Sequence, residues 1–432
     1  MAAGIPTRLT RTLGAPLAVA LALRLLFSLV YWVGQPLTHD EQEYLGLGQS
    51  LAAGRGFVYD EPAGSSEAPE RFGRAPLYPL FVSVFAHRAD DAGVLTTVKV
   101  AQAVLGTLAV LLVAMLARRV AGSAATAPAA WIAAMYPPLI WTTGFIWSET
   151  LYSVLALGNV LLLGTLIDGP SATPSPTAAR SVRRLLVAGI VGGLAALTRP
   201  AHVFFLLLVG LWLLFTRRPV WAAVVAVGAF LVIAPWTARN YAVYGRPVLI
   251  ASEGGVTFWT GNHALAIGEG DMAANPAIKL DNRRVRATHP GLSPEALEQV
   301  YYREAFATIA AQPGWWLGLE ARKLFYLAVP IGPSYMLHSR LYRVATWASY
   351  GLIVLPGLVG LTWAGSRGAT PRTIWLLMAS VVVACLIFLP QERFRIPALD
   401  PGLIVGTAAC VAFWFRRYPA VAAGHWPHDP TP

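Results

Sequence analysis

The sequence predicts an all-α integral membrane protein, a bundle of about ten membrane-spanning helices and at most about twelve. Of its 432 residues, 56% are hydrophobic and only 13% are charged, whereas soluble domains carry about 25% charged residues. The mean hydropathy is +0.55. Apolar runs of about 17–25 residues, each long enough to cross a bilayer, recur along most of the chain.

The basic residues follow a topological pattern. A net charge of +11 would fit a nucleic-acid-binding protein, but the basic residues stand in short clusters between apolar runs, such as Arg118 and Arg119 or Arg217 and Arg218. Clusters of this kind mark the cytoplasmic ends of membrane helices. The charge therefore reports topology, and no nucleic-acid partner is expected. Both cysteines, Cys385 and Cys410, fall inside expected spans, so no disulfide framework is expected.

With the basic clusters inside, both termini are cytoplasmic and nearly all acids fall outside. The expected spans are 14–33, 94–117, 127–147, 150–167, 185–198, the segment between Pro200 and Arg217, 220–236, 341–364, 373–389 and 399–415. Three parts follow: an N-terminal catalytic module (1–237) with a first outer loop (34–93), an outer region with interfacial helices (238–340), and C-terminal spans with a tail (341–432). The composition, rich in Ala, Arg and Gly, suggests a bacterial plasma membrane.

Two apolar pieces do not fit simple spans. Residues 76–86 are too few to cross a bilayer, and residues 324–337 are interrupted by Pro330 and Pro333. We expect the first to be re-entrant or interfacial and the second to lie at the outer interface. No internal repeat is visible, which argues against a transporter built from inverted repeats.

Acidic residues cluster where the chain leaves the first span, in the stretch QPLTHDEQEYLGLG. Asp40 and Glu41 lie there, and Glu149 stands at the outer end of another short span. Acids from separate helix ends at the same depth can share a cleft. A solvated loop remains the alternative, because a carboxylate at the interface costs much less than the roughly 2.5–3.5 kcal/mol at the bilayer centre.

Several cationic and polar side chains are also expected on the outer side, against the positive-inside rule. Arg74 and Tyr78 belong to the stretch RFGRAPLYPL, and an arginine fork suits a phosphate. The further outer candidates for donor binding are Arg199, Arg239, Asn262, His263, Arg393 and Arg395. A bound lipid phosphate would explain them. The alternatives are interfacial anchoring by long side chains and pairing with the outer acids.

The sequence contains no Walker A loop, no HExxH motif and no cysteine-rich cluster, so neither a nucleotide site nor a metal site is predicted. Short motifs instead occur in the order typical of one enzyme superfamily. They are HDEQEY, GRAPLYPLF, SET, GLAALTRP, PWTARNYAVYGRPV, GGVTFWTGN and ERFRIPALDP. Spanning residues 40–401, they resemble membrane glycosyltransferases of the GT-C fold, above all the bacterial branch of the protein O-mannosyltransferase superfamily (glycosyltransferase family 39) and the related aminoarabinose transferases.

The resemblance implies an enzyme that moves one sugar from a polyprenyl-phosphate donor to a hydroxyl acceptor on the outer face of the membrane. It implies that Asp40 is the general base, that Glu41 supports it, and that Glu149 is the acid at the start of the fourth span. Arg74 falls where relatives carry Lys or Arg. Gly73 stands where the aminoarabinose transferases carry an acid, which leaves metal dependence open. The resemblance also does not identify the sugar or the acceptor, which could be a glycan, a lipid or a protein.

Two other functions stay open: a flippase or transporter of lipid-linked sugars, and a non-catalytic membrane assembly partner. A transporter would place charged residues at mid-membrane on broken helices. Here the expected spans are nearly free of charge in their middles and the polar residues gather at one face, which favours the enzyme. Direct attack of the acceptor on the anomeric carbon would invert its configuration.

Overall fold

The protein is described from a computed structural model that covers residues 7–58, 73–86, 91–167, 178–272, 275–292, 294–332, 339–365 and 368–417. Within these ranges the chain forms helices and connecting loops and no β-strand. The all-α membrane fold that the sequence predicts is thereby confirmed.

In the part of the chain that the structure describes, eight helices are long and apolar enough to cross a membrane. They are α1 (Thr7–Leu26, continued by a π-helical turn over Phe27–Tyr31), α4 (Asp91–Ala121), α7 (Glu149–Ile167), α8 (Ala178–Thr198), α10 (Pro219–Tyr244), α15 (Arg340–Gly365), α16 (Ala369–Ile387) and α18 (Leu399–Arg417). All eight were expected as spans.

The other two expected spans differ from simple membrane helices. The apolar helix α9 (His202–Phe215) has only 14 residues. The expected span 127–147 is divided into α5 (Thr126–Met135), α6 (Pro137–Trp141) and a 3-10 turn, Thr142–Gly144. The helix ends at Met135 because Pro137 and Pro138 cannot donate backbone hydrogen bonds.

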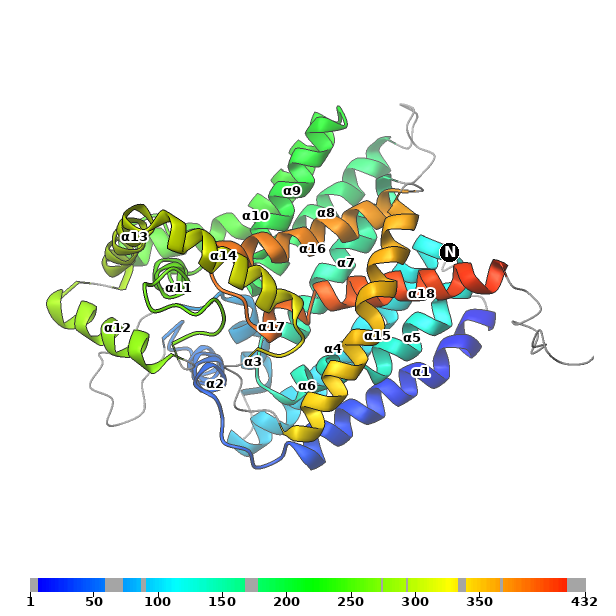
Figure 1. The fold of residues 1–432 in the computed structure, drawn as a ribbon, viewed down its shortest axis with the longest axis horizontal. Coiled ribbons are helices and arrows are strands. Elements are labelled where there is room, and N and C mark those ends of the chain that lie inside the picture. Colours follow the sequence, from blue (N-terminus) through cyan, green and yellow to red (C-terminus); the bar gives the residue numbers. More distant parts are fainter. Residues whose placement is uncertain are drawn as a thin grey trace, which may run out of the picture.

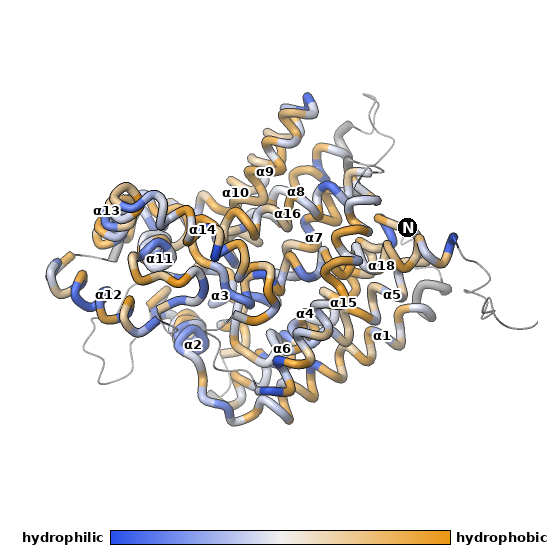
Figure 2. The backbone as a smooth tube through the Cα atoms, in the orientation of Figure 1, coloured by the Kyte–Doolittle hydropathy of each residue, from blue (hydrophilic) through white to orange (hydrophobic). Residues whose placement is uncertain are grey.

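A group of shorter helices gathers at one end of the bundle (Figure 1). They are α2 (His39–Ala52), α3 (Leu77–Ala86), α11 (Gly254–Gly261), α12 (Pro276–Thr288), α13 (Pro294–Ala311), α14 (Pro313–Ala328) and the single turn α17 (Glu392–Arg395). We call this the α2 end. The beginning of α1 and the end of α18 lie at the opposite end, and hydrophilic residues concentrate on α2 and α12 (Figures 1 and 2).

Both apolar pieces that fitted no span lie at the α2 end. The first is α3, a helix of 10 residues. The second begins inside α14, which runs to Ala328 and packs on the membrane helix α16. Residues 333–337 of this piece lie outside the described residues.

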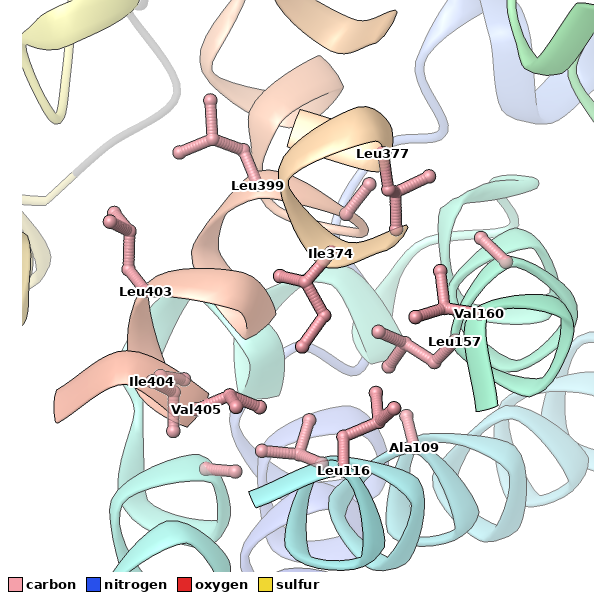
Figure 3. Packing of buried hydrophobic residues seen from close by; sticks show 14 of the residues in the cluster. Ala109, Leu116, Leu157, Val160, Ile374, Leu377, Leu399, Leu403, Ile404 and Val405 are labelled. Carbon is pink, nitrogen blue, oxygen red and sulfur yellow. The ribbon is translucent and has the colours of Figure 1, made fainter. Parts of the chain in front are cut away.

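Apolar side chains of α4, α7, α16 and α18 fill the centre of the bundle (Figure 3). Helices approach most closely where glycines face each other. A Cβ on Gly360 of α15 would lie 1.9 Å from the carbonyl oxygen of Gly406 on α18, and one on Gly189 of α8 would lie 2.2 Å from that of Val225 on α10. Such contacts between small residues are typical of membrane helices, which associate by close packing.

A buried arginine joins two helices inside the bundle. Arg24 of α1 is 1% exposed, and its guanidinium donates hydrogen bonds of 3.3 Å to the carbonyl oxygens of Ala133 and Ala134 in α5. In a continuous helix these carbonyls would accept from residues 137 and 138, both of which are prolines. Arg24 therefore replaces the two missing donors, and its charge lies at a helix C-terminus, where cations are favoured.

A second cation caps a helix end at a proline and thereby fixes the loop before α17. Lys323 of α14 donates to the carbonyl oxygen of Leu386 at 2.8 Å, whose helical partner would be the nitrogen of Pro390. Asn262 accepts from the same ammonium at 3.1 Å and donates to the carbonyl oxygen of Ile387 at 3.1 Å. These contacts join α14 to the end of α16 and so position the residues of α17.

Candidate active site

The first turn of α2 is fixed by a capping box. Glu41 accepts hydrogen bonds from the backbone N–H of Thr38 at 2.8 Å and from its hydroxyl at 2.9 Å, while Thr38 caps the Glu41 N–H. The other Glu41 oxygen accepts from the N–H of Ile146 at 3.0 Å. Burial raises the pKa of Glu41, against the effect of these hydrogen bonds. This carboxylate ties α2 to the segment before α7 and so orients its neighbour, Asp40.

Asp40 lies between two arginines from distant parts of the chain. Nη2 of Arg74 is 2.5 Å from Oδ1, and Nη1 of Arg393 donates to Oδ2. Burial raises the pKa of the Asp40 carboxyl, but the attraction of Arg393 and Arg74 outweighs it and holds the pKa well below its usual range. Asp40 is therefore an ionised carboxylate with a cation on each oxygen.

The two arginines differ in their other partners. Arg74 also contacts Glu43, with Nε 2.6 Å from Oε2, and Glu253, with Nε 3.3 Å from Oε1. Arg393 donates to the neutral amide oxygen of Gln391 at 2.8 Å and lies 4.0 Å from Asp271. Arg74 thus forms ion pairs with three carboxylates, and Arg393 forms a short one with Asp40 and a longer one with Asp271.

Glu149 and Arg199 form a neighbouring ion pair, with 2.6 Å between Oε1 and Nη1. The Glu149 side chain is 3% exposed. Arg199 lies 4.9 Å above the ring of Phe394, the residue after Arg393, and Arg393 lies 5.0 Å above the ring of Trp147. The two expected acids therefore belong to adjacent groups of ion pairs. Asp40 contacts Arg74 and Arg393, whereas Glu149 contacts Arg199.

Three other candidates make hydrogen bonds that stabilise the fold. The hydroxyl of Tyr78, which is fully buried, donates to Gln102 at 2.7 Å. Arg395 pairs with Asp400 at 2.7 Å and donates to the carbonyl oxygen of Val329 at 2.6 Å. Asn262 caps the end of α16, as described above. In this structure their polar atoms face the protein, not a ligand.

The last two candidates make their contacts with residues other than Asp40. Arg239 lies over the rings of Phe57, Trp236 and Tyr244 at the end of α10. His263 lies 3.7 Å from Asp281 of α12 and packs on Trp259. The structure thus joins Asp40, Arg74 and Arg393, places Glu149 and Arg199 beside them, and leaves the other candidates outside this cluster.

The sequence did not single out Glu43 and Glu253 as candidates. Glu43 lies three residues after Asp40 on α2, so helical spacing alone places the two on one face. His39, Asp40 and Glu43 also offer ligand atoms within 4.8 Å of one another, a separation that a metal ion could bridge. The same carboxylate oxygens already bind Arg74 and Arg393, so these residues fit a metal poorly as they stand.

A cavity of about 30 Å³ lies beside the cluster, next to Gly73 and Glu253, which is enough space for ordered water. The side chains of Asp40, Arg74 and Arg393 are partly exposed, by 20%, 17% and 13%, and both arginines already pair with Asp40. A ligand that reaches Asp40 must therefore displace part of this arrangement.

No protein-family model and no curated protein sequence matches the chain. Solved structures do. The archaeal oligosaccharyltransferase AglB from Archaeoglobus fulgidus, in complex with an inhibitory peptide and a dolichol-phosphate, is similar with a TM-score of 0.59 and 16% identity over 99% of this chain and 53% of that one. The same protein in complex with Zn and sulfate gives 0.55 and 16%, over 95% and 50%.

ArnT from Cupriavidus metallidurans, bound to undecaprenyl phosphate, is similar with a TM-score of 0.44 and 15% identity, over 98% of this chain and 82% of that one. The chain spans about half the length of the archaeal enzyme. At these identities the likeness concerns the fold. The chain therefore shares the fold of the archaeal enzyme, which is the GT-C fold that its sequence motifs predict.

Proposed function

We propose that the protein is an inverting glycosyltransferase that moves a single sugar from a polyprenyl-phosphate donor to a hydroxyl acceptor on the extracytoplasmic side of the plasma membrane. One observation carries the proposal: the ionised Asp40 carboxylate lies between Arg74 and Arg393 at the α2 end of the bundle. A base and cations for a departing phosphate are what this reaction needs from the protein, because the sugar already has a leaving group.

The reaction assigns a role to each group. Asp40 takes the proton of the acceptor hydroxyl as its oxygen bonds to the anomeric carbon. The bond from that carbon to the phosphate oxygen breaks, and the polyprenyl phosphate leaves with the electron pair. A positioned base typically contributes about 10²–10⁴-fold in rate, and preorganised cations stabilise the charge that develops on the leaving oxygen.

The remaining residues position these groups. Glu41 orients Asp40 through the capping box, and the Glu149–Arg199 pair supports Phe394 next to Arg393. The donor class is supported by the dolichol-phosphate bound to the archaeal protein with the same fold. The outer location is supported by the position of the α2 end opposite the beginning of α1 and the end of α18, because the positive-inside rule favours the cytoplasmic side for the basic clusters near those two ends.

Asp40→Asn tests the assignment. It keeps the size of the side chain and removes the base, so we expect the product to fall by at least about 100-fold. The measurement is mass spectrometry of envelope glycans, lipids and proteins from cells that lack the gene and carry either form. Asp281→Asn on α12, at a half-buried carboxylate that pairs with Arg284, makes the same chemical change away from the cluster and should leave the product unchanged.

Wild-type levels of product from a well-expressed Asp40→Asn protein would remove Asp40 from the role of base. If purified protein in liposomes moves a lipid-linked sugar across the bilayer without forming a new glycosidic bond, the protein is a flippase instead.

A further inference from the structure

We propose that the donor phosphate and Asp40 compete for Arg393. When the donor binds, Arg393 moves from Asp40 to the phosphate, and Asp40 can then act as the base. This inference rests on the proposed function and adds its regulation: the unoccupied enzyme keeps its base neutralised, and the donor releases it.

We assign the exchange to Arg393 from the ion pairs of the two arginines. To release Asp40, Arg74 would also have to weaken its contacts with Glu43 and Glu253, at 2.6 Å and 3.3 Å. Arg393 instead has the neutral Gln391 at 2.8 Å and Asp271 at 4.0 Å beside its pair with Asp40. A phosphate offers a guanidinium the same planar pairing as a carboxylate and can replace Asp40.

Arg393 can exchange partners without a change of fold. Its turn, α17, is held from both sides, because Arg395 pairs with Asp400 at 2.7 Å and Tyr342 donates to Glu392 at 3.0 Å. The guanidinium itself lies over two flat rings, 5.0 Å from the centre of Trp147 and 5.3 Å from that of Phe394. Stacking of this kind tolerates sliding, so the side chain can move while α17 stays in place.

Asp40 gains proton affinity when Arg393 leaves. The charged groups that face it or its arginines are Arg74, Arg393, Glu43, Glu253, Asp271 and, when protonated, His39. Removal of one of the two attracting cations raises the pKa of Asp40 from well below its usual range towards its ordinary value. A base of higher pKa accepts a proton more readily. The acceptor, or water, is therefore not activated before the donor is bound.

The first experiment measures competition directly, as the binding of undecaprenyl phosphate to the purified full-length protein in detergent. We expect Asp40→Asn to bind this lipid about two- to fivefold more tightly than the wild type, the size of one partly exposed ion pair. Glu43→Gln removes the same charge from a carboxylate that pairs with Arg74, and should change the affinity by less than about twofold.

Each outcome of this experiment supports or overturns the exchange of Arg393. Equal tightening in both variants would reduce the effect to general charge repulsion and overturn the exchange, as would unchanged or weaker binding by Asp40→Asn. Both results leave the proposed function intact, because the lipid phosphate still binds. Failure of every form, the wild type included, to bind it saturably would overturn the donor class itself and the exchange with it.

The second experiment uses Trp147, which lies under Arg393, as a reporter. If Arg393 moves, saturating undecaprenyl phosphate changes the tryptophan fluorescence of the wild type, and the change is lost in Trp147→Phe. If the lipid binds to both forms and the fluorescence change is the same in both, Arg393 has not moved relative to Trp147 and the exchange is wrong.

Discussion

Three carboxylates of this protein show how the environment of one residue type decides its role. Asp40 has a cation on each oxygen and lies where side chains could be displaced by a ligand. Glu149 faces a single arginine and is almost fully buried. Glu41 accepts backbone and hydroxyl hydrogen bonds that hold a helix end. Of the three, Asp40 is the carboxylate whose partners a phosphate would compete for.

The ion pairs of Asp40 predict how stability depends on pH. Because its pKa is lowered in the folded protein, the pairs stabilise the fold fully above the unfolded pKa of about 3.9, and this contribution is lost as the pH falls through the lower folded value. The wild type should exceed Asp40→Asn in melting temperature by a constant amount between about pH 5 and 7, and by less below about pH 4. A difference that grows on acidification would contradict the pairing.

Where two helices of the bundle end before prolines, buried cations supply the missing hydrogen-bond donors. Arg24 serves the end of α5 and Lys323 the end of α16. In both cases the carbonyl that lacks its helical partner lies four residues before a proline. The charge of Arg24 at membrane depth thus has a structural cause and is no sign of a transport path.

Arg24→Met keeps the bulk of the side chain and leaves the carbonyls of Ala133 and Ala134 without their donor. We expect a loss of about 2–4 kcal/mol in the free energy of unfolding, since each unsatisfied buried carbonyl costs about 1–3 kcal/mol. Arg119→Met, at the exposed end of α4, is the matched control and should stay within about 0.5 kcal/mol. Thermal unfolding in detergent measures both, and equal effects would refute the capping role.

The crossing of α15 and α18 depends on glycines at particular positions. Gly360 leaves no room for a Cβ against Gly406, whereas Gly351 on the same helix has open space around it. Gly360→Ala should therefore destabilise the protein by about 1–3 kcal/mol. Gly351→Ala should be neutral or slightly stabilising, because alanine favours helices. Comparable losses in both variants would show that the crossing is looser than described.

For the molecule as a whole, local sequence features predicted the membrane helices well. Apolar runs and the basic clusters between them are properties of short stretches, and eight of the ten expected spans became membrane helices. The division at Tyr136 was missed because the apolar run continues across Pro137 and Pro138, although both prolines were visible in the sequence.

The partners within the candidate site could not be predicted in the same way. The sequence identified Asp40, Arg74 and Arg393 by residue type and expected position. It did not show that Asp40 would bind both arginines, one of them 353 residues away in the chain. Such pairing depends on how α2, the turn before α3 and α17 pack together, and that packing is a tertiary property.

The proposed orientation predicts which residues are accessible from outside the cell. In a protein whose two cysteines are replaced by serine, Arg284→Cys on the exposed face of α12 should react with a membrane-impermeant maleimide in intact cells. Arg417→Cys at the end of α18 should react only after the cells are permeabilised. The opposite pattern would place the α2 end in the cytoplasm and would exclude an extracytoplasmic reaction there.

Cryo-electron microscopy of the protein in nanodiscs with undecaprenyl phosphate tests the account most directly. We predict that the lipid phosphate lies within about 4 Å of the Arg393 guanidinium, the usual limit of an ion pair, and that Asp40 stays on Arg74 with one carboxylate oxygen free to face an acceptor. A phosphate bound away from α2 and α17, with Arg393 still on Asp40, would contradict it.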